Sequence, residues 1–289
     1  MTLPELETIK NLDSFIAPHV LGNEILKRFL TLQMFINPNE NEKLHLLVVG
    51  GTGTGKSELA GFIKEVMSGR CIMIQKDTSP AGLRERLQQN PSIMFADEFD
   101  KTRKDTRSML LESMQSGTVT SDKHNDHGVS TARVNITAMC NPLRAELTED
   151  APLTSQISFS KEYYLLSRFH FVIPVYPADS QLYGEIARKM NAKYTQEEVV
   201  NRIREIVYAI KLENPKVVIP TSLATEVGNY IGYMKETNPN PSTSILLTPR
   251  MIEGYLSAIK SRARMCGRKE AKKEDFEYIK ELHSNVVKV

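Results

Sequence analysis

The chain has 289 residues, of which 40% are hydrophobic and 25% charged, and its net charge is +2. These proportions are typical of a globular protein with one large or two modest domains, and the small net charge excludes a strongly basic, histone-like body. No apolar run approaches the roughly 18 residues of a membrane helix, so we expect no membrane partner. Three widely spaced cysteines and an acidic N-terminus favour a reduced cytoplasmic protein, or a nuclear one in a eukaryote.

The periodicity of apolar residues divides the chain into three segments. Residues 1–43 have helical spacing and end in a polar turn. Residues 44–177 alternate β-rich runs with helical stretches, which predicts an α/β core with a parallel sheet flanked by helices. Helical periodicity dominates residues 178–289, where we expect an all-helical lid. The expected strands of the core are residues 44–49, 71–75, 92–96, 134–140 and 169–175.

The first expected strand leads into Gly50-Gly-Thr-Gly-Thr-Gly-Lys-Ser57, which fills the pattern G-x-x-x-x-G-K-[ST]. Helical spacing over residues 58–66 completes the strand, turn and helix that such a phosphate loop requires. Backbone N–H groups of the loop converge on phosphates, the lysine reaches the β- and γ-phosphates, and the hydroxyl binds Mg²⁺. We therefore expect ATP and Mg²⁺ to be cofactors, bound by Gly51, Thr52, Gly53, Thr54, Gly55, Lys56 and Ser57.

Polar residues follow two other expected strands. Asp97 and Glu98 end the strand that begins near residue 92, and alternating side-chain directions would send them to different tasks. Asp97 would support the Mg²⁺ shell, and Glu98 would polarise the attacking water as general base. The alternative is that the pair caps a helix beginning near Lys101. Asn141 could hydrogen-bond the water or the γ-phosphate, although Asn-Pro alone is also turn chemistry.

Several short motifs occur in the order found in minichromosome maintenance (MCM) replicative helicases: Asp97-Glu-Phe-Asp-Lys101, Leu111-Glu-Ser-Met114, Asn141-Pro142, Leu165-Leu-Ser-Arg-Phe169 and Thr248-Pro-Arg250. Upstream, Ile16-Ala-Pro-His-Val-Leu-Gly-Asn-Glu24 resembles the segment that precedes the family's phosphate loop. The chain thus resembles the AAA+ motor module of that family over nearly its whole length. The resemblance implies an ATPase that acts on DNA as a helicase or translocase in replication. It also implies a homo-oligomeric ring, expected to be a hexamer, with ATP sites at subunit interfaces.

The resemblance assigns roles residue by residue: Walker A to Lys56 and Ser57, Walker B to Asp97 and Glu98, and sensor 1 to Asn141. Arg168 matches the arginine finger and Arg250 matches sensor 2, and both act on the nucleotide of a neighbouring subunit in such rings. A guanidinium supplied in this way stabilises charge on the γ-phosphoryl group as it transfers. The alternative for each arginine is an ordinary surface ion pair.

Residues 118–133 form two β-prone arms around a polar tip, at the position of the family's hairpin that projects into the ring channel. Lys123 matches the basic residue at that tip, where a lysine would contact the phosphate backbone of single-stranded or forked DNA. An ordinary surface hairpin is the alternative. His124 and His127 could suggest a metal site, but they lack two further ligands nearby, so solvated side chains are favoured.

The sequence also departs from the family. Between Lys56 and Asp97 there is no room for the second hairpin that the family inserts, and we expect neither its N-terminal domains nor its winged-helix tail. Two rival functions stay open: a protein remodeller similar to MoxR-type AAA+ chaperones, and a replication assembly factor that binds ATP but hydrolyses it barely. DNA-stimulated ATPase activity would separate them from a DNA motor.

Overall fold

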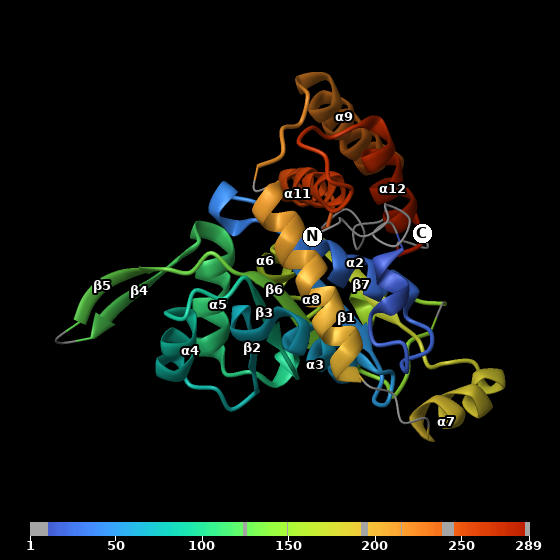
Figure 1. Cartoon of the computed structure of the whole chain (residues 1–289). Coiled ribbons are helices and arrows are strands. Elements are labelled where there is room, and N and C mark those ends of the chain that lie inside the picture. Colours follow the sequence, from blue (N-terminus) through green and yellow to red (C-terminus); the bar gives the residue numbers. More distant parts are fainter. Residues whose placement is uncertain are drawn as a thin grey trace.

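A five-stranded parallel sheet lies at the centre of the computed structural model, in the order β2-β3-β6-β1-β7 (Figure 1). The structure describes the chain except for residues 1–10, 124–125, 149, 192–195, 215, 239–245 and 287–289. The sheet strands match the five that the sequence predicts, which confirms the α/β fold class. Their bounds are Leu46–Gly50 for β1, Cys71–Ile74 for β2, Ile93–Ala96 for β3, Asn135–Cys140 for β6 and Phe171–Val175 for β7.

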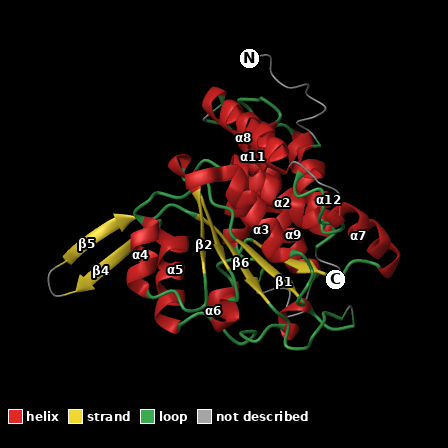
Figure 2. Ribbon diagram, turned by 60° about the horizontal axis from the view of Figure 1, so that its bottom comes forward, coloured by secondary structure: helices red, strands yellow, loops and turns green. Residues whose placement is uncertain are grey.

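Helices cover both faces of this sheet (Figure 2). In β1, Leu46 and Val48 join one hydrophobic cluster with α2 and α3, whereas Leu47 and Val49 join the other with α4 and α5. This alternation is the pleat of a strand that is buried on both faces. The helices are α2 (Glu24–Phe35), α3 (Lys56–Met67), α4 (Pro80–Leu87), α5 (Lys104–Ser116), α6 (Tyr163–Leu166), α7 (Tyr183–Asn191), α8 (Gln196–Glu213), α9 (Thr221–Thr237), α11 (Pro249–Met265) and α12 (Lys273–Ser284).

The C-terminal helices share a core with the sheet. Helix α11 packs against α2, and α8 packs against α3. Arg264 in α11 is fully buried and donates to both carboxylate oxygens of Glu42, at 2.9 and 2.6 Å. Within α11, a Cβ added at Gly254 would lie only 2.4 Å from the Cβ of His170, so the helix backbone rests on the start of β7. The domain boundary at residue 178 stays a prediction.

A two-stranded antiparallel hairpin extends away from this body (Figure 1). Its strands are β4 (Thr118–Lys123) and β5 (Asp126–Thr131), with Thr118 opposite Thr131. The sequence predicts a hairpin at this position, and the structure confirms it. Lys123 ends β4, while His124 at the tip lies outside the described residues. Between β2 and β3 the chain forms only α4, so the second hairpin is absent there, as expected.

Two further expectations concern helices. Within the described part of the chain, none of the helices combines the length and apolar character needed to cross a bilayer. The segment after Glu98 forms the 3₁₀ turn η4 (Phe99–Lys101), and α5 begins only at Lys104. The remaining 3₁₀ turns are η1 (Leu12–Phe15), η2 (Pro38–Glu40), η3 (Ser68–Arg70), η5 (Leu153–Gln156) and η6 (Ser180–Leu182).

Candidate functional site

The carboxyl ends of β1, β3 and β6 meet at one edge of the sheet, because the three strands are parallel neighbours. The phosphate loop, Asp97 and Asn141 follow these strands directly. They surround a cavity of about 590 Å³, a size that suits a nucleotide. The predicted residues that line it are Thr52, Gly53, Thr54, Gly55, Lys56, Ser57, Asp97, Glu98 and Asn141.

The phosphate loop wraps around its own lysine. Lys56 Nζ donates to the carbonyl oxygens of Gly50 and Gly51, both at 2.6 Å. Gly53 and Gly55 have φ angles of +76° and +83°, a region that glycine adopts without strain. Helix α3 begins at Lys56, so its N-terminal N–H groups and their partial positive charge face the cavity. Burial lowers the pKa of Lys56. A loop built in this way can bind phosphate oxygens.

Ser57 and Asp97 lie within hydrogen-bond distance across the cavity. Ser57 Oγ is 3.1 Å from Asp97 Oδ2, while Asp97 Oδ1 accepts from the backbone N–H of Glu98 at 3.0 Å. Hydroxyl and carboxylate oxygens are the hard ligands that suit Mg²⁺. Among the described residues, no group of three His, Cys, Asp or Glu side chains gathers to hold a metal. Two protein oxygens therefore suit an ion that completes its shell with phosphate oxygens and water.

Glu98 lies beside Asp97, but not because of strand alternation. Strand β3 ends at Ala96, and Glu98 has φ +47° and ψ 45°, so a left-handed turn directs its side chain. Its carboxylate pairs with Lys101 and lies 3.3 Å from Lys76 Nζ. The hydrogen bond from Lys101, and then that from Lys76, lower the pKa of Glu98. Contrary to the sequence prediction, strand alternation therefore does not set the direction of Glu98, and neither lysine was expected beside it.

Asn141 follows β6 and lines the same cavity. Its side chain makes no hydrogen bond to any other described residue, which leaves the amide available to a ligand. Its proposed role stays a prediction.

The two arginines lie together, away from the cavity lining. Arg168 follows α6 and Arg250 is in the first turn of α11, where it donates to the Ser167 carbonyl at 3.4 Å. Burial, and then the charge of Arg250, lower the pKa of Arg168. Arg168 Nε and Nη1 are buried and have no hydrogen-bond partner among the described residues. Neither arginine forms an ion pair with a described residue, so the expected alternative of a surface ion pair is not seen here.

Two polar residues upstream of the loop also line the cavity and were not predicted as site residues. Asn23 donates its side-chain amide to the Thr54 carbonyl at 2.8 Å. His19 Nε2 lies 3.0 Å from Glu58 Oε1 in the first turn of α3. The segment that contains them was singled out only by resemblance. Its place beside the loop depends on contacts more than 30 residues apart in sequence.

Comparison with known proteins gives a consistent result. The MCM P-loop domain family model matches residues 3–191. The chain is 28% identical, over 91% of its length, to a minichromosome maintenance protein MCM of Saccharolobus solfataricus. It is 24% identical over 86% to the DNA replication licensing factor mcm4 of Schizosaccharomyces pombe, and 23% identical over 96% to that of Xenopus tropicalis. The chain covers only 42%, 32% and 36% of these three proteins, respectively.

Proposed function

Because the chain belongs to the MCM P-loop family, we propose that it is an ATP-hydrolysing AAA+ motor that acts on DNA in replication. The observation that carries the proposal is the meeting of Ser57, Asp97 and Glu98 in one cavity with the phosphate loop. A loop alone would bind phosphate, whereas the two carboxylates add the groups that hydrolysis requires.

ATP would bind with its phosphates on the loop. Lys56 would exchange its bonds to Gly50 and Gly51 for bonds to the β- and γ-phosphate oxygens. Ser57 and Asp97 would hold Mg²⁺, which when bound neutralises charge on the β- and γ-phosphates. These two side chains are 3.1 Å apart, which supports the proposal because they would need little rearrangement to hold one ion.

Glu98 would act as the general base. Its carboxylate is ionised, because the neighbouring lysines lower its pKa, and it can take a proton from the attacking water. It must first release Lys76 or Lys101 to reach that water. Asn141, on the neighbouring strand end, would orient the water or the γ-phosphate with its free amide.

Arg168 and Arg250 would act on the nucleotide of a neighbouring copy. Both have donors that the described residues leave unused, and neither lines the chain's own cavity. A guanidinium is the group best suited to bind the transferring γ-phosphoryl oxygens. We therefore propose a ring of identical chains, a hexamer by resemblance to the family, with ATP sites completed at each interface.

The hairpin of β4 and β5 would contact single-stranded or forked DNA through Lys123. Its projection from the body supports this role (Figure 1), and the similar proteins include DNA replication licensing factors. DNA as the substrate implies a cytoplasmic location, or a nuclear one in a eukaryote.

The proposal is tested by ATPase and forked-duplex unwinding assays, with and without single-stranded DNA at low salt. We expect DNA to stimulate hydrolysis, and Lys56→Ala and Glu98→Gln to abolish it. Hydrolysis without any response to DNA would favour a protein remodeller. ATP-dependent oligomerisation with negligible turnover would favour an assembly factor.

A further inference from the structure

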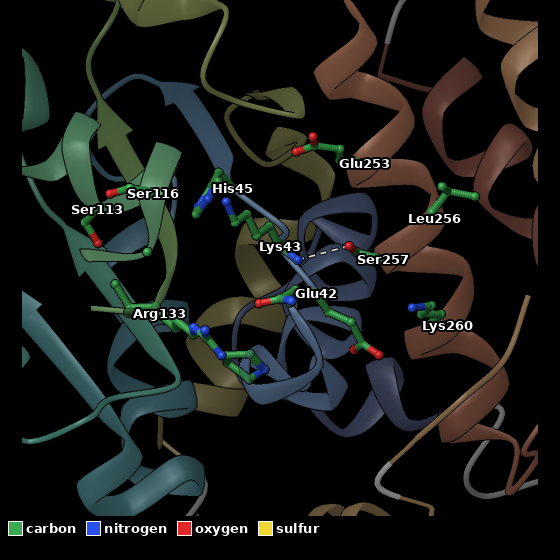
Figure 3. A pocket seen from close by; sticks show the side chains of 14 residues that line it. Glu42, Lys43, His45, Ser113, Ser116, Arg133, Glu253, Leu256, Ser257 and Lys260 are labelled. Carbon is green, nitrogen blue, oxygen red and sulfur yellow. Dashed lines mark hydrogen bonds between the residues drawn. The ribbon is translucent and has the colours of Figure 1, made fainter. Parts of the chain in front are cut away.

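A second cavity, of about 360 Å³, lies at the base of the hairpin and shares no lining residue with the nucleotide cavity. One wall comes from Glu42, Lys43 and His45, in the segment just before β1. The end of α5 and Arg133, two residues beyond β5, form the wall on the hairpin side. Figure 3 shows the opposite wall, formed by one side of α11 with Glu253, Leu256, Ser257 and Lys260.

The charged groups of this cavity are predominantly positive. Arg133 and Lys260 make no hydrogen bond or ion pair within the described part of the chain. Lys43 Nζ donates to the Gln115 carbonyl at 2.7 Å and keeps its charge at the wall. The carboxylate of Glu42 forms an ion pair with Arg264, which balances its charge. Glu253, exposed at the rim, is the one remaining carboxylate among the described lining residues, against three cations.

His45 adds a neutral donor to the same cavity. Its Nδ1 accepts the backbone N–H of Ile136 at 3.1 Å. Burial, with smaller contributions from His170 and Lys43, lowers the pKa of His45 well below its usual value, although the Met114 carbonyl acts in the opposite direction. The ring is therefore neutral and carries its proton on Nε2. That Nε2–H group is buried, and among the described residues the Met114 carbonyl approaches it without forming a hydrogen bond of normal geometry, so an acceptor on a ligand would satisfy it.

The two sides of the cavity are held at a fixed distance. The backbone N–H of Lys43 donates to Ser257 Oγ of α11 at 2.9 Å, as the dashed line in Figure 3 shows. Ser113 of α5 donates to the Ala132 carbonyl at 2.7 Å and so anchors the chain next to Arg133. Donors from three separate elements therefore surround a preformed space that is large enough for a phosphate group and part of the molecule bearing it.

We propose that this cavity binds a phosphate group through Arg133, Lys260 and the Nε2–H of His45. A guanidinium, an ammonium and an imidazole N–H together match the several acceptor oxygens of a phosphate. The group would come from free phosphate or a mononucleotide, or from the backbone of DNA. Bound there, it would bridge the base of the hairpin and α11, because Arg133 and Lys260 belong to those two elements.

The test measures the binding of inorganic phosphate by calorimetry in the full chain carrying Lys56→Ala, which weakens phosphate binding at the loop. In this background we expect Arg133→Ala or Lys260→Glu to weaken binding at the second cavity about tenfold, as expected when one charge-assisted hydrogen bond is lost. Lys104→Glu is the matched control, since Lys104 is an exposed lysine of α5 that does not line the cavity. It should leave binding unchanged.

Nitrogen-15 NMR of labelled histidine locates the site, because phosphate should shift the Nε2 resonance of His45, and Lys260→Glu should move this titration to about tenfold higher phosphate. If an oligonucleotide displaces phosphate, and Lys260→Glu also weakens oligonucleotide binding, the cavity binds a phosphate of the DNA backbone. If phosphate still binds in the presence of saturating oligonucleotide, the cavity binds a free anion. The proposal would be overturned if Arg133→Ala, Lys260→Glu and Lys104→Glu all had equal phosphate affinity. It would also be overturned if phosphate did not shift the His45 resonance. Self-association that depends on Arg133 or Lys260 without any phosphate effect would overturn it too, since the cavity would then accept an acidic segment of another copy.

Discussion

Glu98 Oε2 lies 3.3 Å from Lys76 Nζ, and the other oxygen of the same carboxylate pairs with Lys101. The proposed general base is thus held by two cations, one after β2 and the other in η4. This arrangement keeps Glu98 ionised, but it also occupies the oxygens that must accept a proton from water.

Replacing Lys76 with methionine tests this relationship. The lysines lower the pKa of Glu98, so removing one of them should raise that pKa towards the usual glutamate value. The acid limb of the profile of kcat against pH should therefore move to higher pH. Lys104→Met is the control, since it removes an exposed lysine elsewhere. An acid limb that stays in place, or moves to lower pH, would contradict the arrangement.

Mixing two inactive variants tests whether Arg168 acts on a neighbouring copy. Arg168→Ala alone should lower kcat on the order of 10³-fold, because a charge opposite the γ-phosphoryl group is lost. In an equal mixture with Lys56→Ala, roughly a quarter of interfaces would combine an intact loop with an intact Arg168, and ATPase activity should return in proportion. Absence of rescue at every ratio counts against this role.

The buried pair of Arg264 and Glu42 should contribute strongly to stability. Arg264→Met leaves the Glu42 carboxylate buried without its partner, and we expect the free energy of unfolding to fall by about 3–5 kcal/mol. The double variant Glu42→Met, Arg264→Met should recover much of this loss, because no unpaired charge remains. Urea unfolding measures both. A double variant no more stable than the single one would show that the charge pair is not the cause.

His283 should make the protein sensitive to acid. The His283 side chain is buried, and its Nδ1 lies 2.6 Å from the hydroxyl oxygen of Tyr255. Burial lowers the pKa of His283 to about 4. In the unfolded chain His283 binds a proton near pH 6.5, whereas in the folded chain it does so only near pH 4. Unfolding between these pH values therefore takes up a proton at His283. Stability should therefore fall as pH drops through this window, by about 3 kcal/mol from this group.

His283→Gln removes the titration but keeps a polar side chain next to Tyr255. The free energy of unfolding of this variant should depend less steeply on pH between 6.5 and 4 than that of the unchanged protein. Equal slopes would show that His283 is not a source of the acid sensitivity.

The sequence predicts the five sheet strands and the residues at their carboxyl ends because these signals are local. Gly50–Ser57 is a continuous pattern between an apolar strand and a helix, and Asp97 and Asn141 directly follow apolar runs. Parallel pairing then brings the three strand ends to one edge without further information.

Contacts between distant segments could not be predicted in this way. Nothing near Glu98 in the sequence indicates that Lys76 approaches it, because that contact depends on the pairing of β2 with β3. The direction of the Glu98 side chain depends on a left-handed backbone conformation, which glutamate rarely adopts. His45 likewise occurs in an apolar run, and only the packed structure shows that its Nε2–H makes no hydrogen bond of normal geometry to a described residue.

The close contact of Gly254 with His170 has a mechanical consequence for α11. The helix rests here on the residue that precedes β7. About 15 Å further along its axis, at 1.5 Å per residue, Arg264 joins it to Glu42 in the segment before β1. Its first turn is held as well, because Arg250 donates to the Ser167 carbonyl and Met251 is buried. These contacts make α11 move with the core as one body, so a rotation of the core relative to a neighbouring copy would re-aim Arg250 without bending the helix.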